Sequence, residues 1–209
     1  MIPALYPITS RSHTGLSHTE IITQLIDGGA TFIQIREKTA TPRDFYHEAK
    51  TVIAYAHEHS AKIIINDRVD IAIAVGADGV HLGQDDLPPE HARKLMGDSA
   101  IIGYSTHSIE QAIAATKLPV DYIAIGPIFQ TTSKDNPDPV VGLDMLRTIK
   151  PLIDKPLVAI GGITLSTCRD VWDAGADSVA IISDLYTQSD IAERAREFCR
   201  QSSATVRIP

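Results

Sequence analysis

The sequence predicts an α/β fold, a (β/α)8 TIM barrel that forms a single domain over residues 1–209. Apolar strand-like runs alternate with amphipathic helical runs eight times, in units of roughly 26 residues. The turns at residues 28–30, 76–78 and 174–177 contain glycine, which permits a left-handed exit from a helix. Composition shows no break that would mark a second domain. A doubly wound open sheet is the alternative, but eight units in one chain favour the barrel.

Each predicted unit consists of a short apolar run, which indicates a strand, followed by a helical pattern. We expect strands at residues 4–8, 31–38, 62–65, 79–82, 100–103, 121–125, 156–160 and 178–182. We expect helices at residues 16–26, 42–59, 69–75, 88–96, 109–116, 143–153, 165–172 and 191–201, where apolar residues recur at helical spacing. Gly28 and Gly29 stop the first helix, and Pro42 and Pro88 open the second and fourth.

Composition and charge exclude several classes of protein. Apolar residues make up 44% and charged residues 22% of the chain, as in an ordinary soluble globular protein. The net charge of −7 argues against nucleic-acid binding, which needs a basic stripe. No apolar run approaches ~18 residues, and Met1 leads at once into a strand-like run, so we expect neither a membrane span nor a secretory signal. Cys168 and Cys199 lack metal-site spacing, so we expect free thiols and a cytoplasmic location.

In a barrel of this kind the reactive groups follow the strands, at the carboxyl-terminal face. Gln34, Arg36 and Lys38 are spaced by two in the second unit, so they should point to one face, into the barrel mouth. Ile33 and Ile35 should point the other way, toward the helices. Two inward cations are costly unless an anion is bound there, which predicts an anion site. The alternative is a solvated strand end.

Carboxylates follow the next two strands. Asp67 comes after the third strand and Asp86 after the fourth, and together they could share one Mg2+, which takes one or two carboxylates besides water and phosphate. Each has a rival interpretation as a helix cap, Asp67 before Val69 and Asp86 before a proline pair. His81 lies mid-strand, and we interpret it as a hydrogen-bonded interior histidine.

The remaining strand ends carry hydroxyl groups and glycine. Ser105 follows the fifth strand and can donate to an anion. The long loop after the sixth strand holds Gln130, three hydroxyl residues and Lys134, which suits an anionic ligand, although a polar surface loop is the alternative. Gly161 and Gly162 follow the seventh strand, and residues 182–183 follow the eighth, where such barrels hold a phosphate. Two anion sites indicate two phosphorylated substrates.

Six segments together resemble the thiamine-phosphate synthase family: QIREK, IIINDR, DGVHLGQDD, IGYSTHS, GPIFQTTSK and AIGGI, in this order and over nearly the whole chain. The resemblance implies a transferase of thiamine biosynthesis that joins a hydroxymethylpyrimidine diphosphate to a thiazole phosphate and releases pyrophosphate. It implies Mg2+ as cofactor and small molecules as binding partners, and it leaves a homodimer open.

The resemblance also assigns roles to residues. The pyrimidine diphosphate would contact Gln34, Ile35, Arg36, Glu37, Lys38, Asn66, Ser105 and Lys134. The thiazole phosphate would contact Thr131, Thr132, Ser133, Gly162, Ile182 and Ser183. Asp67 and Asp86 would carry the metal. Catalysis would depend on Arg36, Lys38, Ser105 and Lys134, because these donors can stabilise the departing pyrophosphate.

Two other functions compete with the synthase. A related thiazole tautomerase shares the fold, but Pro127 and Asp67 stand where its members carry histidine and lack the aspartate, which favours the synthase. A non-catalytic barrel that senses phosphorylated metabolites is the other alternative. The inward Lys38, together with Lys134 and the two carboxylates, argues against it.

Overall fold

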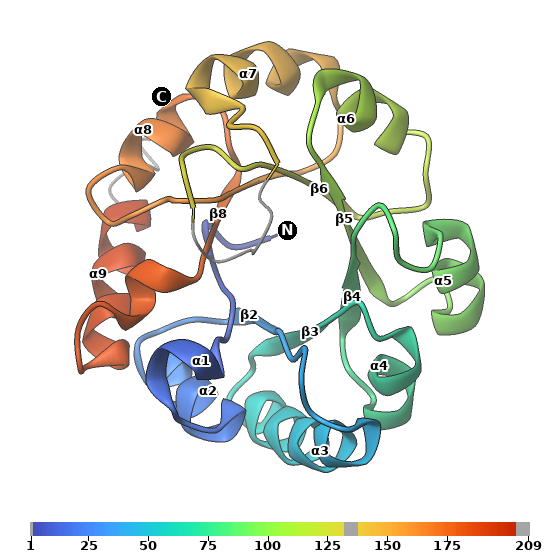
Figure 1. The fold of residues 1–209 in the computed structure, drawn as a ribbon, viewed down its shortest axis with the longest axis vertical. Coiled ribbons are helices and arrows are strands. Elements are labelled where there is room, and N and C mark those ends of the chain that lie inside the picture. Colours follow the sequence, from blue (N-terminus) through green and yellow to red (C-terminus); the bar gives the residue numbers. More distant parts are fainter. Residues whose placement is uncertain (1, 132–137, 204–209) are drawn as a thin grey trace.

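The sheet is a ring of eight parallel strands. In this computed structural model, which describes residues 2–131 and 138–203, the strand order is β1-β8-β7-β6-β5-β4-β3-β2. The strands are β1 (Leu5–Pro7), β2 (Phe32–Ile35), β3 (Lys62–Asn66), β4 (Gly79–Leu82), β5 (Ile101–Thr106), β6 (Tyr122–Ile125), β7 (Leu157–Ile160) and β8 (Ser178–Ile181). A bridge between Ile8 and Gln34 joins β1 to β2, and the Thr9 N–H donates to the Gln34 carbonyl at 2.9 Å. The predicted barrel is therefore confirmed against the open sheet (Figure 1).

Helices surround the ring on its outside (Figure 1). They are α1 (Arg11–Thr14), α2 (His18–Asp27), α3 (Pro42–Glu58), α4 (Val69–Val75), α5 (Pro89–Met96), α6 (Ile109–Ala115), α7 (Gly142–Ile149), α8 (Cys168–Asp173) and α9 (Ile191–Ser203). Two 3-10 helices, η1 (Lys150–Leu152) and η2 (Ser183–Tyr186), follow α7 and β8. No described helix is both long and apolar enough to cross a membrane.

Local capping fixes where the first two long helices begin. Ser17 accepts from the Glu20 N–H while Glu20 bonds back to the Ser17 N–H, which is a capping box. The predicted helix at residues 16–26 therefore begins two residues later than expected. Thr41 caps α3 in the same way through the Asp44 N–H, and Pro42 occupies its first turn as predicted.

Three boundaries differ from the prediction in ways that matter for the site. The strand expected at residues 31–38 ends at Ile35, so Arg36 and Lys38 lie in the loop that follows. The strand expected at residues 100–103 runs on to Thr106, so Ser105 lies within β5. The helix expected at residues 165–172 begins at Cys168, and the Leu165 N–H before it donates to the Asp184 carboxylate at 3.0 Å.

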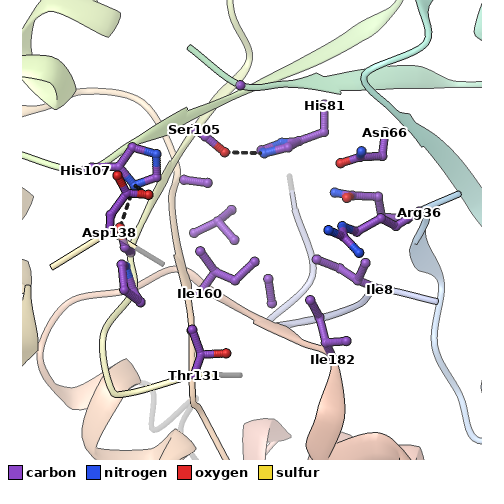
Figure 2. Close-up of a pocket in the computed structure, with 18 of the residues that line it drawn as sticks. Ile8, Arg36, Asn66, His81, Ser105, His107, Thr131, Asp138, Ile160 and Ile182 are labelled. Carbon is purple, nitrogen blue, oxygen red and sulfur yellow. Dashed lines mark hydrogen bonds and ion pairs between the residues drawn. The ribbon is translucent and has the colours of Figure 1, made fainter. Parts of the chain in front are cut away.

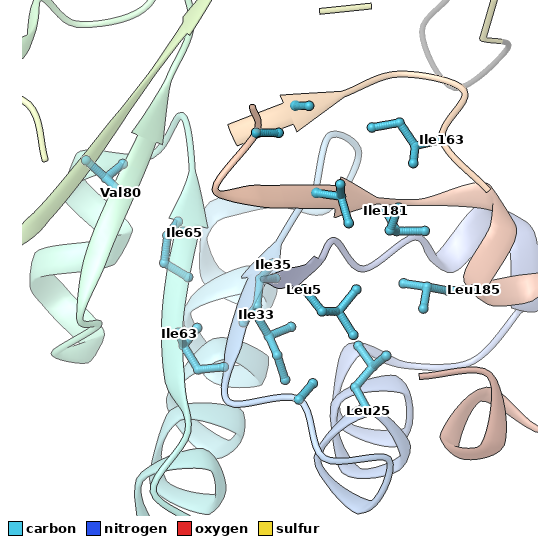
Figure 3. Packing of buried hydrophobic residues seen from close by; sticks show 14 of the residues in the cluster. Leu5, Leu25, Ile33, Ile35, Ile63, Ile65, Val80, Ile163, Ile181 and Leu185 are labelled. Atoms are coloured by element: carbon cyan, nitrogen blue, oxygen red, sulfur yellow. The ribbon is translucent and has the colours of Figure 1, made fainter. Parts of the chain in front are cut away.

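Side chains alternate between two buried layers. Ile33, Ile35, Ile63 and Ile65 point outward and pack with Leu25 and other helix residues, in the layer drawn in Figure 3. The strand residues that alternate with these point into the barrel and form a second cluster. Its members are Tyr6, Ile8, Phe32, Ile64, Tyr122, Ala124, Val158 and Ala180. The interior is thus a packed core, and the carboxyl ends of its strands form the floor of a pocket.

Candidate active site

A cavity of about 550 Å³ opens at the carboxyl ends of the strands. Its floor is apolar, with Ile8, Ile160 and Ile182 among the residues that point into it, while polar side chains stand around the rim (Figure 2). The volume is in the range of small-molecule sites. Most of the predicted site residues within the described part of the chain line this cavity.

Strand β2 and the loop after it bring an amide and two cations to the cavity. Gln34 is buried, and its amide N–H donates to the Tyr6 hydroxyl at 2.9 Å. Arg36 points into the cavity (Figure 2), and within the described residues its guanidinium has neither a hydrogen-bond partner nor a carboxylate. Lys38 lines the same wall and forms an ion pair with Asp67. The predicted inward face of this segment is confirmed, and it holds an unsatisfied cation.

The side chains of Ile35 and Glu37 do not line this cavity. Ile35 is fully buried in the outer layer. Glu37 accepts from the Thr39 and Ala40 N–H groups, at 2.6 and 3.0 Å. Burial raises the pKa of Glu37, but these bonds outweigh it and lower the pKa to about 2. Any contact of these two residues with a ligand would come from the main chain.

Asn66 and Asp67 end β3 at the cavity. Asn66 is 7% exposed, and its side-chain Nδ2 has no hydrogen-bond partner among the residues that the structure describes. Asp67 has φ 61°, a left-handed conformation that Asp tolerates better than most residues. The residue that caps α4 is Arg68, without a side-chain bond, so the cap interpretation of Asp67 is wrong. Both side chains are instead presented to the cavity.

Asp86 reaches the same place from the loop after β4. Its carboxylate accepts from the Gly83 N–H at 2.7 Å, and Pro88 is the capping residue of α5, so Asp86 is not a helix cap either. Burial raises the pKa of Asp86, and the neighbouring Asp67 carboxylate raises it further. Adjacent carboxylates repel each other unless a cation lies with them. A hard divalent cation that also takes water and phosphate oxygens fits this pair.

His81 confirms the interior histidine expected from the sequence. Its Nδ1 lies 2.9 Å from the Tyr122 hydroxyl, and its Nε2 lies 2.9 Å from the Ser105 hydroxyl. Burial lowers the pKa of His81 to about 4, so the ring is neutral near neutral pH. Ser105 lines the cavity beside it (Figure 2).

The opposite wall, on the β6–β8 side, has no lysine or arginine among its described residues. Thr131, Gly162, Ile182 and Ser183 all line it, as predicted, whereas Thr132, Ser133 and Lys134 lie outside the described residues. Gly162 has φ 62°, and a Cβ there would lie 2.3 Å from the Gln130 carbonyl oxygen. Glycine is thus required for the β7 loop to pack against the β6 loop.

The sequence prediction missed two rim residues, His107 and Asp138. The His107 Nδ1–H donates to the Gly126 carbonyl at 2.7 Å, and Nδ1 lies 3.5 Å from the Asp138 carboxylate. Both residues line the cavity. The position of His107 directly after β5 was a usable signal, since a strand end is where barrel ligands bind. The sequence holds no such signal for Asp138, because a long loop separates it from the end of β6.

Comparison with known proteins identifies the family. A family model described as thiamine monophosphate synthase matches residues 5–185. The chain belongs to this family. Thiamine-phosphate synthase of Koribacter versatilis is 48% identical over 202 residues, with 94% of each chain covered. That of Methanospirillum hungatei is 43% identical, with 88% of this chain and 89% of the relative covered.

Solved structures agree with this family membership. Thiamine phosphate pyrophosphorylase from Pyrococcus furiosus superposes with a TM-score of 0.88 at 37% identity, covering 97% of this chain and 96% of the other. The corresponding protein of Bacteroides thetaiotaomicron, at 17% identity and a TM-score of 0.72, supports the fold alone. The thiamine monophosphate synthase family is therefore a barrel family, in agreement with the ring of strands described above.

Proposed function

We propose that the protein is a thiamine-phosphate synthase, which joins hydroxymethylpyrimidine diphosphate to a thiazole phosphate, with or without a carboxyl group, and releases pyrophosphate. One observation carries the proposal beyond family membership. The Arg36 guanidinium and the Asn66 amide face one cavity beside the Asp67 and Asp86 carboxylates, and neither donor has a partner among the described residues. Unsatisfied donors next to a cation-binding pair are complementary to a diphosphate with its metal.

The diphosphate would lie on the β2–β5 side of the cavity. Arg36, Lys38 and Ser105 would contact its oxygens, with Lys134 added from the loop after β6. Asp67 and Asp86 would hold Mg2+. When bound, the ion supplies positive charge that favours the growing charge of pyrophosphate. Glu37 would act indirectly, because its carboxylate fixes the loop that carries the two cations.

The thiazole phosphate would lie on the β6–β8 side. Thr131, Gly162, Ile182 and Ser183 form a wall without lysine or arginine among its described residues, and Thr132 and Ser133 complete the predicted set. A monoester can be held there by hydroxyl and main-chain N–H groups. The apolar floor between the two walls leaves room for the two rings to face each other.

The chemistry then needs no general base. The bond between the exocyclic carbon and the bridging diphosphate oxygen breaks, and its electron pair leaves on pyrophosphate. The thiazole nitrogen supplies the lone pair for the new C–N bond, and no proton moves when the thiazole lacks the carboxyl group. A carboxylated thiazole would in addition lose CO2 and take up a proton at the ring carbon that carried the carboxyl group. The aminopyrimidine ring can stabilise a carbocation, so we propose that the leaving group departs first. An electron-withdrawing substituent on the pyrimidine should then slow the chemical step steeply, and a rate indifferent to it would exclude the dissociative path.

The thiazole tautomerase remains the second candidate, although Asp67 at the cavity and Pro127 after β6 disfavour it. The test is incubation of purified protein with both substrates, either one alone, and both without magnesium. We expect thiamine phosphate and pyrophosphate only when both substrates and magnesium are present. Isomerised thiazole phosphate without pyrophosphate would identify the tautomerase, and binding without any product would identify a sensor.

The remaining expectations are narrower. We propose that the chain is one domain, which the single eight-stranded sheet supports. Within the described residues, Cys168 and Cys199 form no disulfide. A cytoplasmic location and a homodimer stay predictions.

A further inference from the structure

A chain of hydrogen bonds crosses the barrel interior beneath the cavity. The Gln34 amide N–H donates to the Tyr6 hydroxyl at 2.9 Å, and the Tyr6 and Tyr122 hydroxyls lie 2.8 Å apart. Tyr122 then meets His81 Nδ1 at 2.9 Å, and His81 Nε2 meets the Ser105 hydroxyl at 2.9 Å. The five members come from β2, β1, β6, β4 and β5. We refer to these residues as the interior relay.

Packing shows how Tyr122 reaches His81 across an intervening strand. His81 is in register with Gly103 of β5, and Gly103 is in register with Tyr122 of β6. A Cβ on Gly103 would lie 2.0 Å from Tyr122 Cζ and 2.3 Å from its hydroxyl oxygen. The missing side chain on β5 therefore leaves room for the phenol, whose ring stacks on the His81 ring at 5.5 Å between centroids. Glycine at this mid-strand position serves the relay.

The relay has a direction, because an amide N–H can only donate. Tyr6 accepts from Gln34, so its own proton goes to Tyr122, the other partner of its hydroxyl. Tyr122 in turn donates to His81 Nδ1. A buried hydroxyl proton without an acceptor is costly. Because Gln34 donates to Tyr6, both phenol protons find an acceptor only if Tyr6 donates to Tyr122 and Tyr122 donates to His81. His81 therefore carries its proton on Nε2 and donates it to Ser105.

The end of the relay lies at the cavity. Ser105 accepts from His81 Nε2, so its own hydroxyl proton is not used within the relay. We propose that Tyr122 and Tyr6 are positioning residues that fix the Nε2–H tautomer of His81 and thereby leave the Ser105 proton free to donate to an oxygen of the bound diphosphate. The identity of that ligand rests on the proposed function, whereas the tautomer does not.

The first test is nitrogen-15 NMR of the full chain labelled at histidine, with the His81 signals assigned by their loss in His81→Gln. We expect a protonated Nε2 and an unprotonated Nδ1 in the wild type. A protonated Nδ1 would mean that the relay runs from Ser105 toward Gln34, and the proposal would be overturned. This result depends on no substrate and no catalytic activity.

The second test uses variants. Tyr122→Phe keeps the ring and removes the donor to Nδ1, so the His81 signals should shift toward a mixture of tautomers. Tyr55→Phe makes the same chemical change on α3 and should leave the His81 signals unaltered. Unchanged His81 signals in folded Tyr122→Phe would contradict the proposal.

The kinetic test is a double-mutant cycle between Tyr122 and Ser105. Tyr122→Phe and Ser105→Ala should each raise the KM for the pyrimidine diphosphate, on the order of tenfold for a lost bond to a charged group. In Ser105→Ala, the further change Tyr122→Phe should add little, because Tyr122 acts through Ser105. Fully additive effects would reject the relay. A wild type that turns over neither substrate would instead reject the proposed function and leave the NMR result standing.

Discussion

The Lys38 ammonium group contacts the Asp67 carboxylate, so an ion pair connects the end of β2 to the end of β3. The lysine side chain is 51% exposed, and an exposed pair of this kind contributes only about 0–1 kcal/mol to stability. The pair is therefore easily exchanged. When the diphosphate and its metal bind, Lys38 can turn to phosphate oxygens while Asp67 turns to the cation.

This exchange predicts the effect of Asp67→Asn. Asn tolerates the left-handed backbone at this position as Asp does, so the fold should be retained. The magnesium concentration that gives half-maximal turnover should rise on the order of tenfold, since one of two carboxylate ligands is lost. Asp144→Asn, on an α7 side chain that is 98% exposed, is the matched control. Normal turnover at low magnesium in both Asp67→Asn and Asp86→Asn would reject the proposed metal site.

Glu37 predicts a pH dependence of stability. Its pKa is lowered from 4.5 to about 2 in the folded chain, so it stabilises the fold above pH 4.5 and loses this contribution as pH falls toward 2. The full shift corresponds to at most about 3 kcal/mol for a side chain that is 6% exposed. In denaturant titrations, the free energy of unfolding of the wild type should exceed that of Glu37→Gln at neutral pH. The two values should approach each other as the pH falls below 4.5. A difference in the free energy of unfolding that does not change with pH would show that the carboxylate charge does not contribute to stability.

Ser183 gives a test of the wall on the β6–β8 side. Gly162 is unsuitable, because its positive φ and its contact with Gln130 mean that any side chain would disturb the loop itself. Ser183→Ala should raise the KM for the thiazole phosphate about tenfold and leave the KM for the pyrimidine diphosphate near the wild-type value. Ser99→Ala, before β5, is the matched control. Equal effects on both substrates would reject the assignment.

Lys134 carries a prediction from the sequence alone. Loss of one preorganised donor to a leaving group typically costs on the order of 100-fold to 1000-fold in rate. Lys134→Ala should therefore lower kcat by this order while the KM for the thiazole phosphate stays nearly constant. Lys117→Ala, just after α6, controls for loss of a surface charge. A change confined to the thiazole KM would place Lys134 at the other substrate.

The barrel and most of its strand ends were predictable because they depend on local patterns. Alternating apolar runs fix the strands, and parallel strands bring Arg36, Asn66, Asp67 and Asp86 to one face whatever their exact contacts. The boundaries were less predictable, since a few local hydrogen bonds, such as those of the Ser17 capping box, decide where a helix begins.

The interior relay could not be predicted in the same way. Tyr6 and Tyr122 look like ordinary apolar strand residues in the sequence, and their pairing spans 116 positions. Gly103 was the one local sign, because glycine within a strand indicates a close approach by another group. The direction of the Glu37 side chain was equally hidden, because its neighbours face the cavity whereas its own carboxylate turns back to the Thr39 and Ala40 N–H groups.

The most direct test of the central claim is the rate of pyrophosphate release from both substrates with magnesium, measured for the wild type and for Arg36→Ala. The Arg36 guanidinium lines the cavity and has no partner in the described part of the chain, whereas Arg43, on the exposed first turn of α3, serves as the control. We expect pyrophosphate and thiamine phosphate in equal amounts from the wild type and from Arg43→Ala, and a rate at least about 100-fold lower from Arg36→Ala. No pyrophosphate from the wild type, or an equal rate from Arg36→Ala, would contradict the account.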